Sequence, residues 1–192
     1  DIIRSVDIFT GGFGAVYGGR ISSIMDISSK DGNKKQFSGK ASISPFGSKL
    51  MVEGPLKKLS DDGGASISYV FSGKTSYLEQ SSKFLYSYID SAGLPFNFTD
   101  LYGKVSVNGE NGSKVNFFGF NYNDQVRYKA VSDLNWDAWG AGTNFMVLPS
   151  SSPVLIMGKF NISDYQISLA ENDPNSGEQM PPRSSKINGF NL

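Results

Sequence analysis

Residues 1–33 read DIIRSVDIFTGGFGAVYGGRISSIMDISSKDGN, and this stretch sets the order of parts for the rest of the chain. Two short runs of alternating apolar and polar residues, 2–8 and 21–29, flank a segment rich in glycine. Such alternation is typical of β-strands, and clustered glycines allow positive φ and close backbone approach. We predict a strand, a glycine-rich turn with a helical turn near Phe13–Tyr17, and a second strand that ends in a turn at Lys30–Asn33.

The rest of the chain, from Phe37 onward, keeps a period of two and predicts about eight further strands joined as antiparallel neighbours. In the seventh of them the apolar positions change phase after Ile162, which predicts a β-bulge before Tyr165. The predicted strands lie near 37–44, 49–53, 65–72, 101–108, 118–123, 139–147, 154–169 and 184–192. The sequence therefore predicts an all-β fold.

The composition limits the chemistry. The 18 Lys and Arg balance the 18 Asp and Glu, so no net field attracts nucleic acid. The chain has no Cys and no His, which removes thiolate metal sites and a Ser-His-Asp site from these residues. Asp133 and Asp137 supply too few oxygens for Ca²⁺. We expect no catalytic residue, no metal site and no cofactor.

The connections and strand faces favour a membrane barrel. No apolar run of about 18 residues is present, but a spanning strand needs only about 9–11 alternating residues. The long links predicted at 75–99, 129–135 and 171–183 fall on one side, as the outer loops of such barrels do. One face of the strands is apolar and the other carries Ser, Asn, Lys and Gly. Aromatic residues of the apolar set lie near strand ends, among them Phe71, Tyr122, Tyr128 and Trp139. We predict lipid outside this sheet and water or a plug inside it.

The opening segment resembles the end of the plug domain of TonB-dependent outer-membrane receptors, most closely those of Bacteroidetes. In such receptors an Ile-x-Arg strand leads to a glycine-rich turn, a Tyr-Gly pair and a final strand. The residues that match this pattern are Arg4, Gly11, Gly12, Tyr17, Gly18, Gly19 and Arg20. Val52–Leu56 resembles the second barrel strand and its turn. Phe9–Phe13 departs from the Arg-Gly-Pro of many members, which is typical of a subgroup.

The resemblance implies a fragment of a longer protein of the bacterial outer membrane. Residues 1–33 would end the plug, and residues 34–192 would form the first third of a 22-stranded barrel. It implies a non-enzymatic receptor for energised uptake of a bulky nutrient, in contact with outer-membrane lipid. TonB and the inner-membrane energy complex would act through a segment upstream. The resemblance does not decide whether the receptor has a surface lipoprotein partner. It also leaves four classes of nutrient: an iron chelate, cobalamin, a glycan or a peptide.

Six aromatic residues in the long link form the candidate ligand-facing loop. They are Tyr77, Phe84, Tyr86, Tyr88, Phe96 and Phe98. Aromatic faces stack on sugars and rings, but the same residues could equally pack on their neighbours. Arg4 and Asp7 could seat a plug against the barrel wall, with Glu53 as a partner, or remain solvated strand charges.

Two other classes of protein stay open. The first is a small, complete outer-membrane barrel or adhesin of about eight strands that binds ligands with its loops. The second is a secreted glycan-binding or hydrolytic β domain, whose chemistry would need two carboxyl groups about 5–9.5 Å apart. No spacing in the sequence singles out such a pair.

Overall fold

The computed structural model describes residues 2–12, 14, 22–60, 64–86, 88, 93–128, 132–150, 153–172 and 180–191. The chain divides into two compact units, Asp1–Asp31 and Gly32–Leu192. The first unit contains a two-stranded antiparallel sheet of β1 (Ile3–Phe9) and β2 (Ile24–Ser29), which confirms the two strands predicted there. The helical turn predicted near Phe13–Tyr17 lies outside the described residues apart from Gly14.

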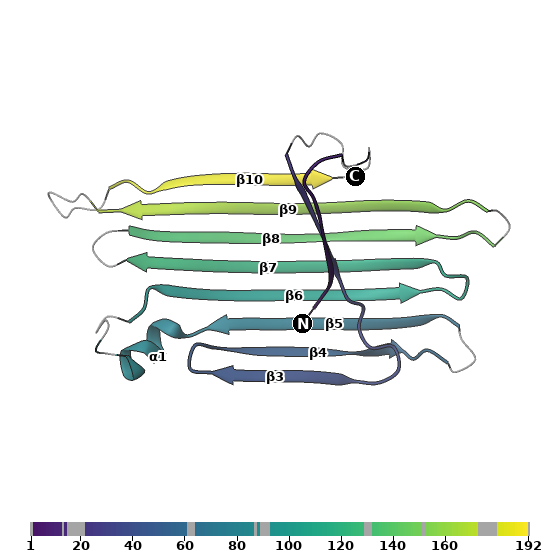
Figure 1. Ribbon diagram of the computed structural model, residues 1–192, viewed down its shortest axis with the longest axis horizontal. Helices are drawn as coiled ribbons and strands as arrows, with labels where there is room; N and C mark the ends of the chain where they lie inside the picture. Colours follow the sequence, from purple (N-terminus) through teal and green to yellow (C-terminus); the bar gives the residue numbers. More distant parts are fainter. Residues whose placement is uncertain are drawn as a thin grey trace. The chain divides into compact units, whose positions relative to one another are not determined.

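The second unit is one antiparallel sheet in which each strand pairs with its neighbours in the chain (Figure 1). Its strands are β3 (Ser38–Ser44), β4 (Gly47–Lys57), β5 (Ser66–Ser76), β6 (Phe96–Asn108), β7 (Lys114–Tyr128), β8 (Ser132–Val147), β9 (Ile156–Glu171) and β10 (Arg183–Asn191). The predicted eight antiparallel strands are confirmed. A helix that was not predicted, α1 (Leu78–Leu85), follows β5. Among the described residues, no helix is long and apolar enough to cross a membrane.

The links at the two ends of the sheet differ less than the sequence predicted. At the end that holds α1, the links 77–95 and 172–182 are long, whereas 45–46 and 129–131 are short. The opposite end has the links 58–65, 109–113 and 148–155. The predicted loop at 129–135 is shorter because β7 and β8 extend further along each other. The expected separation of long from short links is therefore only partly present.

The strand register assigns side chains to the two faces of the sheet, because directly opposed residues in an antiparallel pair lie on the same face. One row crosses six strands through Phe71, Gly103, Gly119, Ala141, Ile162 and Phe190, and we call its side the Phe71 face. A second row runs through Ser68, Ser106, Asn116, Asn144 and Lys159 and defines the Ser106 face.

Two predictions about these faces are wrong. Tyr122 and Tyr128 lie on the Ser106 face, opposite to Phe71 and Trp139, because the register places Tyr122 against Asp100 and Ala138. The apolar residues of the sheet therefore do not share one face. The bulge predicted in β9 is also absent, since its pairing with β8 and β10 is continuous.

The phase change in β9 reflects an inversion of polarity along the strands. Toward the α1 end, the Phe71 face becomes polar through Asn121, Asn123, Gln125, Asp133, Asn135, Asp137, Asp164, Gln166 and Ser168. On the Ser106 face the same ends of the strands become apolar through Phe96, Phe98, Val126, Leu134, Trp136, Ile167 and Leu169. The apolar side chains thus exchange faces without any change in pairing.

Candidate functional site

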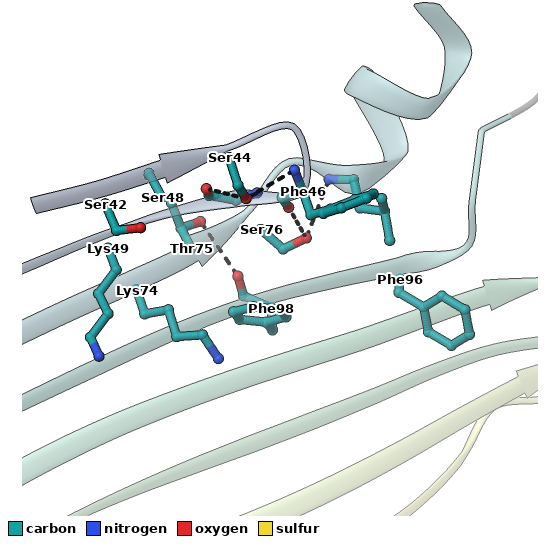
Figure 2. Close-up of a pocket in the computed structure, with 12 residues that line it drawn as sticks. Ser42, Ser44, Phe46, Ser48, Lys49, Lys74, Thr75, Ser76, Phe96 and Phe98 are labelled. Carbon is teal, nitrogen blue, oxygen red and sulfur yellow. Dashed lines mark hydrogen bonds between the residues drawn. The ribbon is translucent and has the colours of Figure 1, made fainter. Parts of the chain in front are cut away.

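A pocket of about 330 Å³ lies at the α1 end of the second unit (Figure 2). The tip of the β3–β4 hairpin, the end of β5, the first residue of α1 and the start of β6 form its walls. Its apolar lining is Phe46, Leu78, Phe96 and Phe98, its hydroxyl groups come from Ser42, Ser44, Ser48, Thr75 and Ser76, and its charged groups are Lys49 and Lys74. The pocket combines rings, hydroxyl groups and ammonium groups.

Hydrogen bonds fix the hairpin tip to the end of β5. The Ser44 hydroxyl accepts the backbone N–H of Phe46 at 3.2 Å and donates to the Gly47 carbonyl at 3.1 Å. The Tyr77 hydroxyl donates to the carbonyl oxygens of Ser44 and Gly47. The Ser76 hydroxyl donates to the Phe46 carbonyl at 3.1 Å. These bonds hold the Phe46 ring at the edge of the pocket.

The two lysines of the pocket are direct cross-strand neighbours. Lys49 on β4 opposes Lys74 on β5, and Lys74 opposes Asp100 on β6. Figure 2 shows the Lys49 and Lys74 side chains on neighbouring strands, with their ammonium groups apart from each other. The Lys74 Nζ lies 3.9 Å from the Asp100 Oδ2 and 4.2 Å from the centre of the Phe98 ring. Like charges directly opposed in a sheet destabilise it, and the Asp100 carboxylate on β6 offsets the charge of Lys74.

Helix α1 is tied to the start of β6 by polar contacts. The Glu79 carboxylate accepts from the Lys83 Nζ at 3.2 Å and from the Asn97 Nδ2 at 3.0 Å. The hydrogen bond from Lys83, together with that from Asn97, holds the pKa of the Glu79 carboxyl below its ordinary value. The buried Ser82 hydroxyl accepts the backbone N–H of Leu94 at 2.8 Å.

The structure divides the six predicted loop aromatics into three groups. Phe96 and Phe98 belong to β6 rather than to a loop, and both line the pocket. Tyr77 and Tyr86 pack on the hairpin tip: Tyr77 through its hydroxyl, and Tyr86 through a ring stacked 6.3 Å from that of Phe46. Phe84 and Tyr88 are 88% and 80% exposed. The sequence left two roles open for these residues, lining a site and packing on neighbours, and the structure contains examples of both. Contact with a ligand stays a prediction.

Of the residues that line the pocket, sequence reasoning predicted only Phe96 and Phe98, and the residues that it missed include Phe46, Lys49, Lys74 and Leu78. The polar positions of β4 and β5 include both lysines, but their juxtaposition depends on the register between these strands. That register shifts between Pro55 and Lys57, and alternation within a single strand does not reveal such a shift.

The predicted plug-motif residues lie in the first unit. Arg4 is exposed on β1, where the pairing with β2 shifts register, and Gly11 and Gly12 follow that strand. Gly12 has a φ of 65°, which favours glycine. Tyr17, Gly18, Gly19 and Arg20 lie outside the described residues. The predicted pairing of Arg4 and Asp7 with Glu53 would join the two units and stays a prediction.

The pocket lining combines apolar rings with a few polar groups, as the lining of small-molecule sites generally does. Within the described ranges, no three His, Cys, Asp or Glu side chains gather in a way that could hold a metal ion. Comparison of the chain with protein-family models, curated proteins and solved structures gives no match. The case for a function therefore depends on the geometry of the sheet and pocket and on the resemblance of residues 1–33.

Proposed function

We propose that the chain is part of a TonB-dependent outer-membrane receptor that imports a bulky nutrient. Residues 1–33 would come from the end of the plug and residues 34–192 from the barrel wall. The observation that carries the proposal is an exposed apolar band on the Phe71 face, away from the α1 end. Its larger exposed side chains are Phe71, Phe117, Trp139, Phe145, Phe160, Ile162 and Phe190. Val52, Tyr69, Val105 and Val107 belong to the same face and are half-buried.

The apolar band is as long, measured along a strand, as the segment that crosses the hydrocarbon core of a bilayer. On β8 its positions run from Trp139 to Val147, which matches the roughly 9–11 residues of a tilted spanning strand. Trp139 is 46% exposed and Phe117 is 53% exposed. Soluble monomers rarely expose an apolar patch of several strands' width. Lipid is the solvent that fits this surface.

The polar half of the Phe71 face supports the same orientation. Strands β7, β8 and β9 have 15, 16 and 16 residues, which is more than a bilayer requires. The additional residues carry a hydrogen-bonded network in which Asp137 accepts from Asn135 at 2.6 Å and Asp133 accepts from Arg127 at 3.0 Å. Such groups favour water. We place the α1 end outside the membrane, on the side from which a nutrient arrives.

The Ser106 face would line the barrel interior. Within the height of the apolar band it carries the apolar residues Val70, Phe118 and Phe120 together with buried polar residues. The buried polar residues are Ser68, Lys104, Ser106 and Asn116. Polar inward-facing residues alternate with apolar lipid-facing ones in outer-membrane strands. This alternation fits a lumen that contains water or a plug.

The strand order favours a part of a large barrel over a complete barrel of eight strands. A closed barrel of eight strands would pair β3 with β10, but these strands form opposite edges of the described sheet (Figure 1). The secreted glycan-binding domain, the other alternative, has no need of an exposed apolar band.

Two experiments test the proposal: cell fractionation tests the location of the full-length protein, and growth tests examine nutrient uptake. We expect the protein in the outer-membrane fraction, with a gel mobility that changes on boiling. We also expect its deletion and a deletion of the TonB gene to impair growth on the same member of a panel of iron chelates, cobalamin, glycans and peptides. Recovery of the protein in a soluble fraction, or growth defects on different nutrients, would contradict the proposal.

A further inference from the structure

We infer that the pocket at the α1 end binds an uncharged aromatic ring. The inference deepens the proposed function by naming a chemical feature of the nutrient, and in that respect it rests on it. Binding itself depends only on the second unit. The volume of about 330 Å³ is at the lower limit of small-molecule sites, which span roughly 300–1,000 Å³. The pocket therefore fits one ring with a small substituent, either as a separate molecule or as one group of a larger ligand.

The charged groups of the lining already have partners. The Lys74 Nζ lies 3.9 Å from the Asp100 Oδ2 and 4.2 Å from the centre of the Phe98 ring, and Lys49 also takes part in an interaction. A charged ligand would lose its water on binding, whereas both lysines of the described lining are engaged without it. The lining therefore favours a neutral ligand.

Three hydroxyl groups of the lining are engaged as well. The Ser44 and Ser76 hydroxyls bond to the backbone of the hairpin tip, and the Thr75 hydroxyl pairs with that of Thr99 at 3.0 Å. A sugar would need several free donors and acceptors, because its own hydroxyl groups lose water on binding. The pocket is therefore poorly equipped for a sugar, although that ligand is neutral.

Apolar ring surface remains available to a ligand. Phe46 and Phe96 both line the pocket and stay exposed, and Leu78 adds a third apolar side chain. The hydrogen bonds of the hairpin tip hold the backbone of Phe46, and the Phe46 ring stacks on that of Tyr86. A group that is ordered before binding loses little freedom when a ligand arrives. Aromatic rings attract each other beyond the burial of their area, so these walls favour an aromatic ring over an aliphatic one.

The pocket continues into apolar surface on the Ser106 face. Phe96 begins a cross-strand row through Val126, Leu134 and Leu169, and its ring meets that of Tyr128 edge-on at 6.4 Å. In the proposed receptor this face lines the lumen on the side from which the nutrient arrives, where contact with water alone would favour polar residues. Accessible apolar patches often mark ligand-binding grooves. The row therefore gives the rest of an apolar ligand a surface beside the pocket.

The experiment is a binding titration of the full-length protein in phospholipid nanodiscs with benzamide, a neutral aromatic ring, followed by ligand-observed NMR with empty nanodiscs as the baseline. We expect Phe96→Leu to weaken binding about fivefold, because the ring contact is lost while the apolar bulk is kept. Phe118→Leu is the matched control: it makes the same change on the Ser106 face of β7, outside the pocket lining, and should leave the Kd unchanged.

Two further ligands test the chemistry of the pocket. Cyclohexanecarboxamide keeps the amide but lacks the aromatic ring, and it should bind the wild type about fivefold more weakly than benzamide. Benzoate keeps the ring but carries a charge, and it should also bind more weakly, because its carboxylate loses water and both lysines are already engaged.

Four results would overturn the inference: no binding of benzamide, binding of benzoate as tight as that of benzamide, equal binding of the cyclohexane amide, or equal losses in the Phe96 and Phe118 variants. A change of gel mobility on boiling verifies that each variant is folded. Because nanodiscs require no energy complex, a failure to bind is separate from a failure of the growth test. Binding without linked growth defects would refute the proposed uptake and leave the site intact.

Discussion

Gly142, in the middle of β8, offers a sharp test of the register of the sheet. A Cβ added to this glycine would lie 2.7 Å from the Phe160 carbonyl oxygen, 2.8 Å from the Asn161 Cβ and 2.8 Å from the Phe118 Cζ. The phenyl ring could turn aside, but the backbone oxygen of β9 could not. Glycine in a strand often marks such a close approach of neighbouring groups.

The Gly142→Ala substitution should destabilise the protein by about 0.5–2 kcal/mol. Overpacking costs about 1–3 kcal/mol, and the smaller loss of chain entropy for alanine returns about 0.5–1 kcal/mol. Gly119→Ala is the matched control on β7, because its Cβ would meet only the Gly140 carbonyl oxygen, at an ordinary 3.6 Å. It should leave the free energy of unfolding unchanged or raise it slightly.

Denaturant unfolding in phospholipid vesicles measures both variants. The fluorescence of Trp136 and Trp139 reports on β8 itself, and the chain has no other tryptophan. The reasoning would be refuted if Gly142→Ala were as stable as the wild type, or if Gly119→Ala lost as much stability.

Two further predictions concern helix α1. Glu79 has a lowered pKa in the folded state, so the stabilisation that its carboxylate gives through Lys83 and Asn97 is present above its ordinary pKa and is lost as the pH falls through the folded pKa. Hydrogen exchange of α1, corrected for intrinsic rates, should therefore rise at acidic pH in the wild type and be nearly independent of pH in Glu79→Gln; equal pH dependence in both would contradict this assignment. Replacing Ser82 by alanine leaves the N–H of Leu94 without its acceptor and should destabilise the link by about 1–3 kcal/mol. Exchange at Leu94 measures this loss, and unchanged protection would refute it.

The sequence was a good guide to the strands and a poor guide to their faces. Alternation and turn residues predicted the link between β6 and β7, where Gly112 has a φ of 84°. The same alternation did not show that Phe118 opposes Lys104 rather than Val105. Face assignment needs the register across each turn, and a shift of one residue moves every side chain to the other face.

The pocket was partly predictable for a related reason. Phe96 and Phe98 stood out as aromatics in a long link, but their spacing did not show that they belong to β6 and line one pocket with the tip of the β3–β4 hairpin. The inversion of polarity along the strands hid this, because aromatic residues on the Ser106 face resemble those of the Phe71 face when each strand is considered alone. Lys49 and Lys74 come together only through long-range pairing.

The central claim is that the Phe71 face meets lipid and the Ser106 face does not. The chain contains no cysteine, so single cysteines at Ala141, Ser106 and Asn123, each introduced into a full-length protein from which any cysteine elsewhere has been removed, accept one fluorescent label. The full-length protein, reconstituted with brominated phospholipid, should show strong quenching at Ala141, in the apolar band. It should show little at Ser106, on the other face, or at Asn123, beyond the band. Quenching at Ser106 as strong as at Ala141, or no quenching at any of the three, would contradict the account.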